Sequence, residues 1–229
     1  MASELSRGGS PASVKPLDPL FEIWLHPRKT IAKLSDSISY LWIVVITVLA
    51  GVNDGFDRAV ESHLGNQAEL VKVIYSALFG GALVGTVVLL VGSLLLWLVA
   101  KIFKGQASFK QVILAFAWAR LPIAISALLW IPLLVVYGDA LFVTGGLDIM
   151  NGPPFFKFIG ALMLALKLWA IVLLIATLTE VEGFSHWWKG LVCVLIIVLL
   201  TVLLSILISL GGVMMKLGQT AKAAALTAQ

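Results

Sequence analysis

The chain has 229 residues, of which 60% are hydrophobic and 12% are charged, and its mean hydropathy is +1.04. Soluble domains are about 45–50% apolar and about one quarter charged, so a soluble fold of this length could not bury so much apolar surface. The composition excludes a soluble globular domain and predicts an all-α bundle with lipid as its solvent. The net charge of +4 is mild and the cations form no dense run, so no nucleic-acid partner is expected.

Residues 1–17 are rich in Ser, Gly and Pro, which predicts a disordered N-terminal tail. The next segment, 18–37, mixes apolar residues with cations, and we expect it to lie in the membrane interface as one amphipathic helix or two short ones. An ordinary juxtamembrane linker is the alternative. The expected interfacial anchors are Trp24 at headgroup level and three cations against anionic lipid, Arg28, Lys29 and Lys33.

Apolar stretches predict five transmembrane helices within a membrane domain at 38–213. The first span, 39–52, is shorter than the ~20 residues that a bilayer core needs, so residues on either side must continue the helix. A polar, acidic loop is expected at 53–69. The second span, 70–103, is long enough to tilt or to project beyond the lipid. The remaining boundaries are 155–178 for the fourth span, 187–213 for the fifth and 214–229 for a C-terminal tail.

The third span is expected to run from Ser108 to about Tyr137. Ser108 followed three residues later by Gln111 is typical of a capping box that opens a helix. Pro122 and Pro132 each lack the backbone N–H that a helix interior uses, so they predict interruptions of this helix.

The distribution of Lys and Arg predicts the orientation of the chain. With the N-terminus inside, nine cations fall on inner segments: Arg7, Lys15, Arg28, Lys29, Lys33, Lys101, Lys104, Lys110 and Lys189. Five fall on outer segments: Arg58, Lys72, Lys157, Lys216 and Lys222. The inner excess predicts a cytoplasmic N-terminus, and an odd number of spans then places the C-terminus on the extracytoplasmic side.

Small residues recur on nearly one face of the second span: Ala77, Gly81, Gly85 and Gly92. Without the bulk of a larger side chain, two helices can approach closely and gain van der Waals contact. This face predicts helix packing, either with another protein or a second copy of the chain, or against another span of the same chain.

Two cations lie inside predicted spans, where a charge should face protein or water. Arg120 lies in the inner half of the third span, and its expected partner is Glu180 or Glu182 at the inner end of the fourth. Snorkelling to the inner headgroups is the alternative for Arg120. Lys167 lies near the middle of the fourth span, too deep to snorkel, and is expected either to bond backbone carbonyls or to bind a substrate or ion.

No motif for catalysis, metal binding or cofactor binding is recognisable. The three histidines lie in different predicted loops, and the sequence contains no HExxH spacing, no nucleotide-binding glycine motif and no paired acidic dyad. The sequence therefore predicts no catalytic residue, no metal and no cofactor, in a protein that is not an enzyme.

Several segments carry a resemblance to a known family. They are residues 21–30 (FEIWLHPRKT) before the first span, 105–109 (GQASF) and 117–122 (AWARLP) around the start of the third, and 180–185 (EVEGFS) before the last. In this order, and on five spans, they resemble the Yip family of integral membrane proteins, in its bacterial branch. The resemblance covers roughly residues 19–210.

The resemblance implies a non-enzymatic membrane adaptor or assembly factor in a bacterial plasma membrane. Eukaryotic relatives bind Rab-type GTPases, but their Asp-Leu-Tyr-Gly-Pro signature is not matched here, so a GTPase partner is not expected. Some bacterial members are thought to act beside ABC exporter components, which implies other integral membrane proteins as partners, ABC exporter components among them. The alternative is a small transporter or channel subunit that uses Lys167 and Arg120, although five spans offer no obvious inverted repeat.

Overall fold

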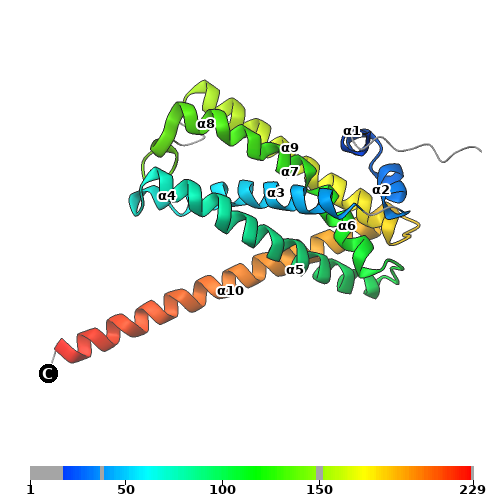
Figure 1. Ribbon diagram of the computed structural model, residues 1–229. Coiled ribbons are helices and arrows are strands. Elements are labelled where there is room, and N and C mark those ends of the chain that lie inside the picture. The colour runs from blue at the N-terminus through cyan, green and yellow to red at the C-terminus, as the bar shows by residue number, and fades with distance from the viewer. Residues whose placement is uncertain (1–17, 37–38, 148–151, 228–229) are drawn as a thin grey trace, which may run out of the picture.

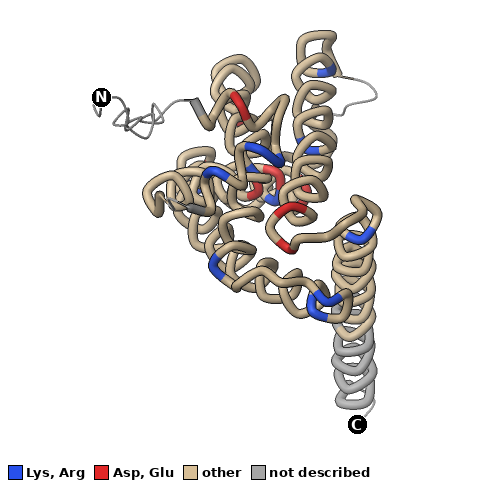
Figure 2. The backbone as a smooth tube through the Cα atoms, turned by 90° about the vertical axis from the view of Figure 1, so that its right-hand side faces the viewer, with Lys and Arg blue, Asp and Glu red and all other residues tan. Residues whose placement is uncertain are grey.

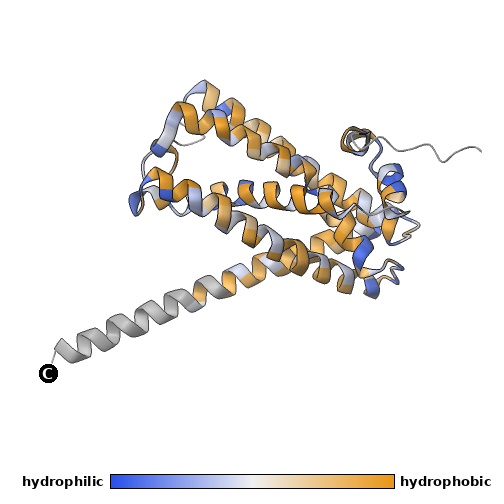
Figure 3. Cartoon of the chain, in the orientation of Figure 1, coloured by the Kyte–Doolittle hydropathy of each residue, from blue (hydrophilic) through white to orange (hydrophobic). Residues whose placement is uncertain are grey.

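The computed structural model describes residues 18–36, 39–147 and 152–227, and every regular element in these ranges is helical. The tail expected at 1–17 lies outside the described residues. Five helical stretches are long and apolar enough to cross a membrane, which confirms the predicted polytopic helical bundle. Hydrophobic residues run along these helices, while hydrophilic residues concentrate at the two ends of the bundle (Figure 3).

The elements follow one another as an up-and-down bundle (Figure 1). Two short helices come first, α1 (Asp18–Leu25) and α2 (Pro27–Asp36), before the first span, α3 (Tyr40–Glu61). A short turn, η1 (Leu64–Asn66), leads to the second span, made of α4 (Leu70–Tyr75), the π-helical turn η2 (Ser76–Gly80) and α5 (Gly81–Ile102). The third span contains α6 (Phe109–Ala119), α7 (Leu121–Ser126), η3 (Ala127–Leu129) and α8 (Trp130–Tyr137), followed by η4 (Gly138–Leu141). The last two spans are α9 (Pro154–Val181) and α10 (Trp187–Thr227).

We call the end of the bundle that carries α1, α2 and the α5–α6 and α9–α10 connections the near end, and the opposite end the far end. α1 and α2 form a hairpin at the near end, where Ile23 and Ile31 are fully buried in a cluster shared with α3 and α6. Trp24 is half-buried against the same cluster. The segment expected at the interface is thus two short helices that dock on the bundle through their apolar face.

The first span extends beyond the apolar stretch at 39–52, as its short length predicted. α3 continues past Val52 to Glu61, so much of the predicted acidic loop belongs to a 22-residue helix. At 1.5 Å per residue this helix is about 33 Å long, which matches the ~30 Å hydrocarbon core. The loop prediction was wrong because the polar residues of this segment have partners on other helices.

The third span is interrupted as predicted, and its capping box is confirmed. Ser108 N donates to Gln111 Oε1 at 2.9 Å, and Gln111 N donates to Ser108 Oγ at 3.4 Å. The helix breaks at Arg120, immediately before Pro122 enters the first turn of α7. Arg120 therefore lies at a corner between two helices.

α3 and α5 approach each other closely through glycines. A Cβ on Gly81 would lie 2.5 Å from the carbonyl oxygen of Gly51, and a Cβ on Gly85 would lie 2.5 Å from the Cα of Gly51. Gly92 faces the ring of Phe116 in α6. The small-residue face of the second span is therefore used inside this chain, which favours internal packing over an interface between chains.

α10 leaves the bundle. Its first turns pack against α5 and α9, where Cys193 and Val194 are buried. Farther along, large apolar side chains such as Leu199 and Leu203 are exposed. Two views turned by 90° both show this helix directed away from the other spans (Figures 1 and 2), and it continues to Thr227 through the stretch predicted as a C-terminal tail.

Candidate functional site: a polar layer inside the bundle

Polar side chains from four helical segments meet between two apolar clusters, one toward the near end and one toward the far end. Basic and acidic segments lie beside one another inside the bundle (Figure 2). We call this group the polar layer; its members are Asn53, Asp54, Asp57, Arg120, Ser126, Trp130 and Lys167.

Asn53 is fully buried and links α3 to the third span. Its Oδ1 accepts hydrogen bonds from Ser126 Oγ at 2.9 Å and from Trp130 Nε1 at 3.1 Å. Its Nδ2 donates to Asp57 Oδ2 at 3.0 Å. Because an unpaired amide in an apolar interior costs about 1–3 kcal/mol, the bonds from Ser126 and Trp130 fix the rotation of α3 against α7 and α8.

Arg120 pairs with Asp54 of α3. The arginine side chain is 8% exposed and the aspartate side chain 30%. The guanidinium also lies 6.0 Å from the ring centroid of Phe116, and its Nη1 is buried without a hydrogen-bond partner among the described residues. The ion pair holds the corner between α6 and α7 against the first span.

The partner predicted for Arg120 was wrong, because both glutamates are engaged elsewhere. Glu180 Oε2 lies 3.8 Å from Arg28 Nε, and Glu182 Oε2 accepts a hydrogen bond from Ala107 N at 3.0 Å. Asp54 was missed because it was assigned to a loop. A signal for it was present, since a first span of 14 residues (52 − 39 + 1) is too short for a bilayer, and a longer helix carries Asp54 into the membrane.

Lys167 is the fourteenth of the 28 residues of α9 (167 − 154 + 1), at the middle of the span. Its Nζ donates to Asp57 Oδ2 at 2.8 Å. The lysine side chain is 39% exposed and the aspartate side chain 24%. The observed partner is thus a carboxylate of α3, which is neither the backbone carbonyls nor the substrate or ion that the sequence analysis proposed.

The remaining predicted site residues lie outside the polar layer. The interfacial anchors Trp24, Arg28, Lys29 and Lys33 belong to the near-end hairpin, where Lys33 Nζ pairs with Glu22 Oε2 at 3.0 Å. The small-residue face, Ala77, Gly81, Gly85 and Gly92, lies along the second span, and its first members pack on α3.

Glu182 joins two near-end connections. Its side chain is buried, and its backbone oxygen accepts a hydrogen bond from Gln106 N at 3.2 Å in the α5–α6 connection. Burial raises the pKa of Glu182, although the N–H of Ala107 and the charge of Lys101 act in the opposite direction. The residue therefore fastens the turn from which α10 starts.

Five apolar spans packed around a charged layer define a polytopic α-helical membrane protein in contact with the bilayer. A family model described as the Yip1 domain matches residues 21–208, which is most of the chain and includes most of the near-end hairpin. The chain belongs to this family. No curated protein and no solved structure matches the chain.

Proposed function

We propose that this Yip1-family protein is a non-enzymatic membrane adaptor or assembly factor, and that it binds another integral membrane protein through α10. The observation that carries this proposal is the course of α10. The most apolar 18-residue stretch of this helix has a mean hydropathy of 3.2, yet only 17% of the stretch is buried. A span gains stability by packing against neighbouring helices, and a partner would supply the contacts that the chain itself does not give to α10.

The polar layer supports the adaptor over a transporter. Arg120 and Lys167 are each matched by a carboxylate of α3, so both cations already have a role in holding helices together. A small transporter or channel subunit remains the second candidate, because the side chain of Lys167 is 39% exposed at mid-span. In that case Lys167→Met abolishes flux in a reconstituted vesicle assay while the protein stays folded; unchanged flux would eliminate this candidate.

We further propose a bacterial plasma membrane and a cytoplasmic N-terminus. The support is the distribution of cations, with nine Lys and Arg on inner segments and five on outer ones. A topology reporter fused after Gln229 should report the extracytoplasmic side. A cytoplasmic signal would refute this orientation.

Components of ABC exporters are the partner class that the family resemblance suggests, and co-purification tests it. The full chain, extracted in a mild detergent, should retain a stoichiometric exporter subunit. A triple Leu/Ile→Ala variant at the exposed positions Leu199, Leu203 and Ile206 of α10 should lose it. The neighbouring face is tested by the same change at Leu200, Leu204 and Leu207.

The matched control carries three Leu→Ala changes on the exposed face of α5, at Leu83, Leu90 and Leu94. It should retain the subunit at the level of the unmodified chain. A solitary monomer, or a subunit retained by both α10 variants, would overturn the proposal.

A further inference from the structure

Arg58 lies on α3 directly after Asp57, but it takes no part in the ion pairs of the polar layer. Arg120 and Lys167 are each paired with an aspartate, whereas Arg58 has no carboxylate at salt-bridge distance among the described residues. Its Nε donates to the backbone oxygen of Asp54 at 3.0 Å. No other hydrogen bond of its side chain is formed among the described residues, so the rest of its fork of N–H donors can bind an anion.

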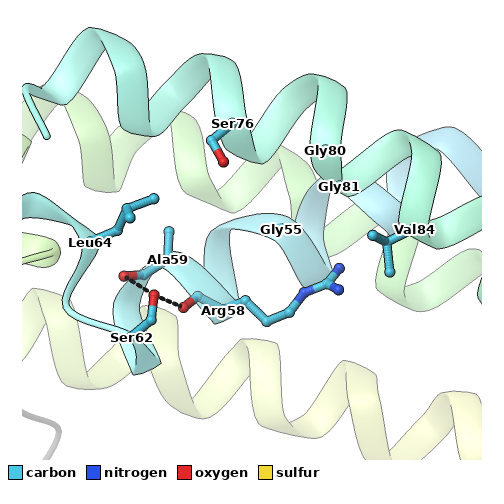
Figure 4. Close-up of a pocket in the computed structure, with 9 residues that line it drawn as sticks. All are labelled: Gly55, Arg58, Ala59, Ser62, Leu64, Ser76, Gly80, Gly81 and Val84. Atoms are coloured by element: carbon cyan, nitrogen blue, oxygen red, sulfur yellow. Dashed lines mark hydrogen bonds between the residues drawn. The ribbon is translucent and has the colours of Figure 1, made fainter. Parts of the chain in front are cut away.

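Arg58 is exposed, and its guanidinium extends toward the near end rather than toward the far-end surface. Side chains on a helix lean toward its N-terminus, which for α3 is the near end. The group extends away from Ser62 and Leu64 and toward Val84 (Figure 4). A snorkelling arginine would extend to the far-end surface instead, so this guanidinium is placed where a charge needs a counter-charge.

A pocket of about 230 Å³ lies beside this guanidinium, between α3 and the second span. It is lined by Gly55, Arg58, Ala59, Ser62, Leu64, Ser76, Gly80, Gly81 and Val84. The π-helical turn η2 forms part of its wall, and such turns are frequent at functional sites. Ser76 brings a hydroxyl group to the same space, whereas the hydroxyl of Ser62 donates to the backbone oxygen of Arg58 at 2.7 Å.

We propose that this pocket binds the phosphate of a phospholipid from the far-end leaflet, with Arg58 as the cationic ligand. The planar guanidinium suits the oxygens of a phosphate. Phe79 and Leu83 precede the lining residues Gly80 and Val84 in the sequence and are 71% and 70% exposed, which gives acyl chains an apolar surface on the same helix. The pocket is too small for a helix, which is about 10–12 Å wide, so a lipid headgroup fits it better than a partner helix does.

The test uses the full chain, delipidated in detergent, and measures its thermal unfolding with three probes: phosphatidylglycerol, diacylglycerol and inorganic phosphate. Phosphatidylglycerol should raise Tm by about 2–4 °C, as expected when a ligand binds only the folded state. Diacylglycerol lacks the phosphate and inorganic phosphate lacks the chains, so both should leave Tm within about 1 °C. If diacylglycerol or inorganic phosphate raised Tm as much as phosphatidylglycerol does, the assignment to a phospholipid would be overturned.

Variants locate the site. Arg58→Met should abolish the phosphatidylglycerol shift, and Arg58→Lys should keep part of it. Lys72→Met is the matched control, because Lys72 is a well-exposed cation of the same far end but does not line the pocket; it should keep the full shift. A full shift in Arg58→Met would overturn the proposal.

Gly80→Leu tests the pocket with Arg58 intact, in case Arg58→Met does not fold. A Cβ on Gly80 would have Ser76 Oγ at 3.9 Å as its nearest neighbour, so a larger side chain can enter the pocket without a backbone clash. This variant should fold and lose the shift. Two results would overturn the proposal. One is a Tm shift with phosphatidylglycerol that Gly80→Leu retains. The other is an unmodified chain that shows no lipid response, together with a co-purifying protein that both Arg58→Met and Gly80→Leu lose, which would assign the surface to a protein.

Discussion

α3 and α10 are opposites within one bundle. The most apolar window of α3 has a mean hydropathy of 1.3 and is 44% buried, whereas that of α10 has a mean hydropathy of 3.2 and is 17% buried. In water the more apolar helix would lie inside. In lipid the outer face must be apolar and the interior can hold paired polar groups, so the least hydrophobic span becomes the central one.

The second and third spans follow the same trend, whereas the fourth, with a mean hydropathy of 2.5, is only 22% buried. The third span, with a mean hydropathy of 2.1, is 39% buried, and the second, at 2.6, is 28% buried. The third span supplies the partners of Asn53 and Asp54, while the second span meets α3 through glycines. Burial in this bundle therefore depends on having groups that need a partner or that permit close approach.

The largest expected effect comes from breaking an ion pair of the central helix α3. Asp54→Ala leaves Arg120, 8% exposed, as an unpaired charge, and should lower the free energy of unfolding by about 3–5 kcal/mol. Denaturant unfolding in detergent measures this loss. The double variant Asp54→Leu, Arg120→Leu should recover most of it, because it removes both charges. A single variant as stable as the unmodified chain would contradict a structural role for the pair.

A smaller effect compares glycines on the two kinds of helix. Gly81→Ala forces a Cβ to 2.5 Å from the Gly51 carbonyl oxygen and should cost about 1–3 kcal/mol through overpacking. A Cβ on Gly211 of α10 would meet no atom of the described residues within 4 Å, so Gly211→Ala should be neutral or gain up to about 1 kcal/mol. Denaturant unfolding of the two variants gives both values. Equal effects at the two positions would remove the distinction between a central and a peripheral span.

Lys167→Met tests the ion pair at the edge of the polar layer, where α9 meets the central helix α3. The remaining Asp57 is 24% exposed, so the loss should lie between that of an exposed pair and that of a buried pair, at about 1–2 kcal/mol. A double-mutant cycle with Asp57→Asn should give a favourable coupling energy. Strictly additive effects of the two changes would show that the pair does not couple α9 to α3.

The smallest effect concerns the base of α10. Burial raises the pKa of Glu182, so the folded state binds a proton more tightly than the unfolded state does. The stability contributed by this residue is therefore present below the ordinary carboxyl pKa of about 4.3 and is lost as the pH rises above that value toward the raised pKa. The stability difference between the unmodified chain and Glu182→Gln should decline over this interval in pH-dependent unfolding, and a difference independent of pH would contradict the effect of burial.

Much of the architecture was predictable from local patterns. Apolar stretches predicted five spans, Ser108 and Gln111 predicted the cap of α6, and the proline at 122 predicted the corner beside Arg120. These features depend on residues close in sequence, because a helix satisfies its own backbone and a cap needs only its first turn. A few short sequence segments were also enough to predict the family, and the family match over residues 21–208 confirms that prediction.

The polar layer, by contrast, was decided by tertiary structure. The sequence singled out Arg120 and Lys167 as costly charges but did not show that they pair with Asp54 and Asp57, which lie 66 and 110 residues away from them. A carboxylate in lipid is tolerated only when a distant helix brings it a cation. Composition by itself thus determined that the chain is a membrane bundle, whereas the packing of α3 against α7 and α9 decided where its charges pair, since pairing depends on distances in space.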